Sequence, residues 1–194
     1  PVDPEIKVSV TAYLPDTWIP DATQRLLAYK RLAGVRTDEE LDNLVEDLAD
    51  RFGRLPAVAA ALVDTLRLRV RALALGVAKV EQGPAAISIT LDPRGLLQGD
   101  TLLQLVNIRG SRWRLSPDMV LTRTFSREEG DTPLDTGREI LEQLLRLGNA
   151  PASVLLEIEA ESVVDLPAAA PANRTLPGPG LRPPPGSGRL RRMR

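Results

Sequence analysis

The chain has 194 residues, 43% of them hydrophobic, and its 25 lysines and arginines nearly balance 26 acidic residues. This length allows one domain of about 150 residues with a sizeable core, together with a further segment. Neither cysteine nor histidine occurs in the sequence. Their absence excludes disulfides, thiolate or histidine metal sites, and the catalytic arrangements that need either residue.

The sequence carries no sign of export or membrane insertion. It contains no run of about 18 apolar residues, and residues 1–5 lack the basic and apolar regions of a signal peptide. We therefore expect a cytoplasmic protein with no membrane contact. Because the chain begins with Pro1 rather than Met, we also expect further sequence upstream.

Charge is distributed unevenly along the chain. After residue 165 the only ionisable side chains are six arginines, which carry +6. Because the net charge of the whole chain is −1, the first 165 residues carry a net charge of −7. Prolines and glycines separate these arginines, which leaves too few apolar groups to offset the entropy cost of ordering. We predict a single domain over residues 1–150 and a disordered Pro/Arg-rich tail over residues 151–194.

The hydrophobic pattern predicts a mixture of strands and helices. Period-two alternation indicates a strand over 6–14, and capping signals with helical spacing indicate helices over 22–33, 37–53 and 56–75, the last two antiparallel. Further on we expect a hairpin over 77–81 and 85–91, a helix over 95–108, strands over 113–115 and 118–124, and a helix over 134–147 closed by Gly148. This order favours an α+β fold, a small mixed sheet packed with several helices in one compact domain.

Three acids lie close together on the helix predicted over 37–53. A helical wheel directs Glu46, Asp47 and Asp50 away from the core. A catalytic acid usually needs a cleft that shifts its pKa, and an outward helix face offers none by itself. Asp47 and Asp50 also occupy the last turns, where the helix dipole disfavours anions. One interpretation is that Arg51 and Arg54, each four residues further on, offset this cost in a solvated network. The alternative is a docking patch for an arginine-bearing partner.

Nucleotide and cofactor signatures are absent from the sequence. Neither GxxxxGK[ST] nor GxGxxG occurs, and the acidic run at residues 38–40 begins a helix, where the dipole stabilises carboxylates. No residue set indicates a catalytic, cofactor or metal site. A small enzyme that uses carboxylates remains only as a residual alternative.

Arginine clusters raise the alternative of an independent nucleic-acid-binding module. It would use the basic tail together with Arg109, Arg112 and Arg114. The −7 body opposes this interpretation, because its field repels phosphate. On the predicted strand, Trp113 is expected to face the core rather than stack on bases. Arg67 and Arg71, on the helix over 56–75, are expected to face solvent.

Several sequence blocks resemble the C-terminal domain of bacterial transcription-repair coupling factors. They are LPDTWIPD at residues 14–21, RL at 25–26, YKRLA at 29–33, DLADRFGRLP at 47–56, LALGV at 73–77 and WRL at 113–115. Their order and spacing are rather specific, and together they cover roughly residues 5–148. The Pro-rich tail has no recognisable counterpart.

The resemblance implies a regulatory, non-catalytic domain that follows an ATP-driven DNA translocase motor in a larger protein. The parent of such a domain removes stalled RNA polymerase from damaged double-stranded DNA and recruits the excision-repair protein UvrA. ATP and Mg²⁺ belong to the motor of that parent. The C-terminal domain, a monomer, is implied to fold back on the N-terminal UvrA-binding domain, mask it and restrain translocation.

The resemblance also assigns the docking residues. In the family motif Glu-x-x-Asp-Arg-Phe-Gly, the Glu and the Asp face arginines on the UvrA-binding domain. The matching positions here are Asp47 and Asp50. Asp47 keeps the charge of the family Glu with a shorter reach, and the neighbouring Glu46 can take its place. We therefore expect interdomain docking through Asp47, Asp50 and Glu46.

Overall fold

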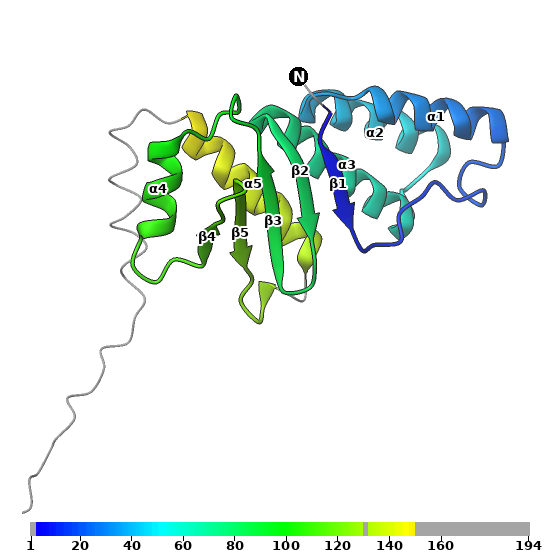
Figure 1. Ribbon diagram of the computed structural model, residues 1–194. Coiled ribbons are helices and arrows are strands. Elements are labelled where there is room, and N and C mark those ends of the chain that lie inside the picture. Colours follow the sequence, from blue (N-terminus) through cyan, green and yellow to red (C-terminus); the bar gives the residue numbers. More distant parts are fainter. Residues whose placement is uncertain (1–2, 130–131, 150–194) are drawn as a thin grey trace, which may run out of the picture.

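The computed structural model describes residues 3–129 and 132–149 (Figure 1). Over these residues the chain forms five helices and a five-stranded sheet in one compact domain. The predicted α+β class is confirmed. The tail predicted from residue 151 lies outside the described residues. Within them, no helix is both long enough and apolar enough to cross a membrane.

The sheet is mixed, with strand order β1-β2-β3-β5-β4. Its strands are β1 (Glu5–Val8), β2 (Val77–Gln82), β3 (Ala86–Leu91), β4 (Trp113–Leu115) and β5 (Val120–Thr124). β1 pairs with β2 in parallel, and the other neighbours are antiparallel. The hairpin expected after residue 77 is therefore confirmed as β2 and β3.

The five helices of the described residues are α1 (Ala22–Gly34), α2 (Asp38–Phe52), α3 (Ala57–Leu75), α4 (Gly99–Asn107) and α5 (Pro133–Asn149). The expected capping chemistry is present. The Asp21 carboxylate accepts from Gln24 N at 2.7 Å to begin α1, and Thr37 Oγ1 accepts from Glu40 N at 3.1 Å to begin α2. Gly76 ends α3 in the left-handed region, with φ 68°, which glycine adopts without strain.

α3 joins two hydrophobic cores. Its Leu68 and Leu75 pack with α4, α5 and one face of the sheet, whereas its Ala59 and Val63 pack with α1 and α2. Figure 1 shows α1 and α2 at one end of the molecule and α4 at the other, with α5 lying across the sheet. Burial on both sides of one helix therefore holds α2 against the rest of the domain.

Several predicted boundaries differ from the structure. The strand expected over 6–14 ends at Val8, because Val8 pairs with Gln82, the last residue of β2, and no partner continues. α4 begins at Gly99 rather than residue 95, since Leu96 N donates to Leu75 O and fixes the preceding segment against α3. α5 extends past Gly148 to Asn149.

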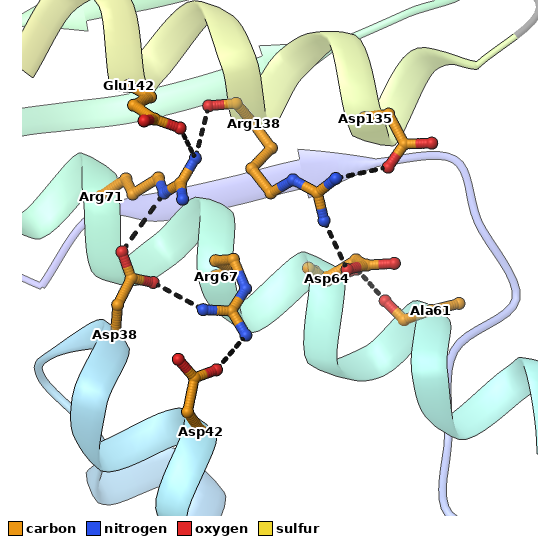
Figure 2. Close-up of polar contacts among 10 residues, drawn as sticks. Asp38, Asp42, Ala61, Asp64, Arg67, Arg71, Asp135, Arg138 and Glu142 are labelled. Carbon is orange, nitrogen blue, oxygen red and sulfur yellow. Dashed lines mark hydrogen bonds and ion pairs between the residues drawn. The ribbon is translucent and has the colours of Figure 1, made fainter. Parts of the chain in front are cut away.

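Arg67 and Arg71 do not face solvent, so that expectation is wrong. Their side chains are only 17% and 13% exposed, because both bind Asp38 at the start of α2, at 3.0 and 3.3 Å (Figure 2). Arg67 also binds Asp42 of α2, and Arg71 binds Glu142 of α5. The first turn of α2 thus meets the second half of α3, which confirms the antiparallel pair.

Candidate docking surface

The candidate docking surface lies on the outer side of α2. Leu41, Leu44 and Leu48 bury the opposite side against α1 and α3. With this stripe fixed inward, a period of about 3.6 residues turns the intervening acids outward. The helix is therefore positioned by its apolar face, and its acidic face is available for contact.

The structure places the three predicted docking residues on this outer side. Glu46 and Asp50 are exposed, and the Asp47 side chain is 41% exposed. Asp47 lies on the flank that faces α1, where its carboxylate accepts from Arg31 Nη1 at 2.6 Å. The three acids are therefore not equivalent. Within the described residues neither Glu46 nor Asp50 takes part in an ion pair, whereas Asp47 already has a cationic partner.

One of the two interpretations of the acidic cluster paired Asp47 with Arg51 and Asp50 with Arg54. Neither pair forms among the described residues, although all four side chains lie within them. Arg51 instead places its guanidinium 5.1 Å from the centre of the Phe52 ring, a cation–π contact. In the described part of the chain, the ion pair that an acid in the last turns of α2 does form is that of Asp47, and its partner Arg31 belongs to another helix.

Trp18 anchors the end of α2, a role that the sequence pattern did not reveal. Its indole Nε1 donates to Gly53 O at 3.1 Å, and its ring lies edge-on to Phe52 with centroids 6.1 Å apart. The Trp18 side chain is itself buried. Because Gly53 is the C-cap of α2, this contact fixes the turn that carries Asp50. Trp18 belongs to the LPDTWIPD block, which was the available signal.

A groove of about 510 Å³ runs between α1 and α2 beside the acidic face. Lys30 and Arg31 line it on one side, and Glu40 and Asn43 line it on the other. Arg31 therefore contributes to both the groove and the pair with Asp47. A side chain that enters the groove from a partner meets charges of both signs.

The arginines proposed for nucleic-acid binding are not all available for phosphate. Arg112 binds Glu129 at 2.7 Å, and Glu129 also binds Arg123 at 2.7 Å. Burial alone would raise the pKa of Glu129, but hydrogen bonds from Ser126 and Arg123 and the charge of Arg123 lower it to about 2. A carboxylate that stays ionised well below neutral pH thus pairs with both Arg112 and Arg123 at this end of the sheet.

Trp113 faces the core, as predicted: it is only 9% exposed and packs in the hydrophobic cluster of the sheet. It is not displayed for stacking on bases. Arg109 and Arg114 are exposed, Arg109 in the turn that follows α4 and Arg114 on the outer side of the edge strand β4.

One cavity outside the docking surface holds carboxylates. It measures about 490 Å³ and is lined in part by Asp64 and Asp135. The pKa of Asp64 is raised above its usual value, because burial disfavours the charged carboxylate by more than the nearby Arg138 favours it. Arg138 binds Asp64 at 3.3 Å and Asp135 at 2.9 Å (Figure 2). One arginine thus ties both acids in a structural ion-pair network. Among residues 3–129 and 132–149, no group of three or more acids is placed to hold a metal ion.

Comparison with known proteins identifies the family. Residues 8–102 match the model of the TRCF domain. Transcription-repair-coupling factors are similar in sequence: that of Escherichia coli K12 is 31% identical over 140 residues, and that of Myxococcus xanthus is 27% identical over 144 residues. These matches cover 72% and 74% of this chain but only 12% of either relative. The factor of Mycobacterium bovis is 37% identical over 93 residues, 48% of this chain and 8% of its own length.

The fold comparison agrees with the sequence comparison. The crystal structure of the C-terminal domain of a transcription-repair coupling factor matches with a TM-score of 0.58 and 24% identity, covering 82% of this chain and 96% of that chain. At this identity the match supports the fold. The chain therefore belongs to the TRCF domain family and corresponds to the C-terminal domain of transcription-repair coupling factors.

Proposed function

We propose that this chain is the regulatory C-terminal domain of an ATP-dependent DNA translocase that acts in transcription-coupled repair. It docks through the outer face of α2 on the N-terminal UvrA-binding domain of the same protein. Docking masks the UvrA-binding surface and restrains the motor until stalled RNA polymerase is engaged. The domain itself hydrolyses no ATP. The boundary between the domain and the tail lies near residue 150.

The observation that carries this proposal is the exposed acidic pair Glu46 and Asp50 on a helix that is held rigidly from behind. Like charges at i and i+4 repel, and Asp50 stands where the helix dipole disfavours an anion. Both costs remain within the described residues because no cation pairs with either acid. An arginine-bearing partner relieves both costs at once, and bidentate arginine–carboxylate pairs suit this geometry.

The test is calorimetric titration of the 194-residue chain into the separately expressed UvrA-binding domain of the parent. We expect binding that weakens as salt increases, and we expect the double variant Asp47→Arg, Asp50→Arg to lose it. Both side chains lie outside the core, so circular dichroism of the double variant should match that of the wild type.

The tether in the parent raises the effective concentration, so contact in the parent does not require tight binding between separate pieces. The same charge reversal is therefore also made in the full-length parent, where unmasking should increase UvrA binding. If neither the titration nor UvrA binding changes on charge reversal, the docking proposal is wrong. ATPase activity of the purified chain would contradict its regulatory, non-catalytic assignment.

A further inference from the structure

Two adjacent leucines of α1 are more than half exposed. Leu26 is 56% exposed and Leu27 is 54% exposed, although the same helix buries Ala28 and Leu32 in the core. The packing of α1 therefore does not use them. A single exposed leucine is ordinary on a protein surface, but apolar side chains grouped beside a polar border are typical of interaction sites.

Leu27 connects this apolar face to the acidic face of α2. It lies four residues before Arg31, and residues at that spacing are neighbours on a helix surface. Arg31 in turn reaches across to Asp47 at 2.6 Å. Leu27, the Arg31–Asp47 pair and Asp50, three residues after Asp47, are thus successive neighbours on the surface of the two helices, and Glu46 lies four residues before Asp50. Leu26 is turned about 100° from Leu27 around α1.

We propose that Leu26 and Leu27 are the apolar half of the docking surface, and that one arginine-bearing domain covers both halves. This inference rests on the proposed function and names a second determinant of the same contact. Arg31 already pairs with Asp47, so within the described residues Glu46 and Asp50 are the acids of this surface that take part in no ion pair. On α1 the exposed Lys30 lies four residues after Leu26 and adds a positive charge beside it. A partner that covers this surface must bring cations beside an apolar patch.

The test replaces Leu27 by Gln, alone and together with Leu26→Gln, in the 194-residue chain. Glutamine has a similar length and helix propensity, and both sites are exposed, so the melting temperature should not fall. We expect Leu27→Gln to weaken binding to the UvrA-binding domain by about five- to ten-fold. The double variant should weaken it further, with the salt dependence of binding unchanged.

Leu103→Gln is the matched control. Leu103 is also 54% exposed, but it belongs to α4, at the opposite end of the molecule from α1 (Figure 1). Its substitution should leave the Kd unchanged. An equal loss in this control would mean that any exposed leucine contributes non-specifically, and it would overturn the inference.

The remaining outcomes separate the inference from the proposed function. If the Asp47→Arg, Asp50→Arg variant loses binding while both leucine variants keep it, the apolar half is overturned and the acidic contact stands. If the wild-type chain does not bind the UvrA-binding domain and charge reversal does not change UvrA binding by the parent, the inference and the proposed function are both wrong. Self-association of the wild type that Leu27→Gln abolishes would assign the face to a second copy and overturn the inference.

Discussion

Arg31 of α1 donates from Nη1 to the carboxylate of Asp47 in α2 at 2.6 Å, across sixteen residues of sequence. Both side chains are about half exposed, at 52% and 41%. The pair links the two helices that form the proposed docking surface. A partner arginine that approaches Asp47 must therefore share or displace Arg31.

We predict that Arg31→Gln strengthens docking on the UvrA-binding domain. Removal of the internal cation leaves Asp47 free for the partner, and exposed ion pairs of this kind contribute up to about 1 kcal/mol, so the gain should be about two- to five-fold in Kd. Calorimetric titration measures it. Arg54→Gln removes the same charge from an exposed site at the end of α2, and an equal gain in that variant would show a general field effect instead.

We predict opposite effects on stability and docking for Asp50→Asn. The substitution removes an anion from the last turn of α2 and its repulsion with Glu46, so the free energy of unfolding should rise by about 0.5 kcal/mol. Docking should weaken by about ten-fold, because the lost contact is a charge-assisted hydrogen bond. Denaturant unfolding and calorimetry check the two halves. A loss of stability would show that Asp50 serves the isolated fold.

The docking surface could be predicted from the sequence only in part. The capping residue Thr37 and the apolar spacing of α2 are local signals, so the helix and the outward direction of Glu46 and Asp50 followed from the pattern. The partner of Asp47 did not, since a helix pattern suggests Arg51 at i+4 and carries no information on Arg31 in another helix.

The same limit explains the error at Arg67 and Arg71. A helical wheel treats the side of a helix away from one core as solvent, but α3 lies between two cores, and α2 and α5 both reach it. Burial of such arginines depends on which acids other helices bring to them. That information resides in the tertiary arrangement and not in the spacing along α3.

We predict that Arg71→Ala is strongly destabilising. The Arg71 side chain is 13% exposed and binds Asp38, Glu142 and the Arg138 carbonyl. Its removal takes one of two cations from Asp38, which keeps Arg67, and from Glu142, which keeps Arg146, and it leaves the Arg138 carbonyl without this donor. The free energy of unfolding should therefore fall by about 1–3 kcal/mol. Denaturant unfolding measures the loss. The control is Arg94→Ala, since Arg94 pairs with Asp92 but is 83% exposed, and that substitution should cost less than about 0.5 kcal/mol.

We predict that Glu129 stabilises the fold in a pH-dependent way. Its pKa falls from 4.5 to about 2 on folding, so its contribution is complete above the unfolded value and is lost as the pH decreases toward about 2. Because the carboxylate is 26% exposed, solvent screening limits the contribution to about 1–3 kcal/mol. Glu129→Gln should lower the free energy of unfolding by this amount at about pH 7.

Unfolding of both proteins across this pH range provides the measurement. The difference between wild type and Glu129→Gln should shrink toward zero as the carboxyl becomes protonated. The neighbouring Glu128 is exposed, so Glu128→Gln should change stability little at any pH. A constant difference for Glu129→Gln would mean that the amide is misplaced for steric reasons rather than for its missing charge.

We predict that the effect of Gly137→Ala changes sign with the residue at position 82. Gln82 of β2 is 7% exposed. A Cβ added to Gly137 of α5 would lie 2.9 Å from the Cδ of Gln82. The Gln82 amide must leave its present rotamer to make room for this Cβ, so Gly137→Ala should lower the free energy of unfolding by about 1 kcal/mol. In a Gln82→Ala background the same change should raise it by up to about 1 kcal/mol, because alanine is the better helix former. Denaturant unfolding of the four proteins measures the coupling, and equal effects in both backgrounds would show that β2 and α5 do not meet at this point.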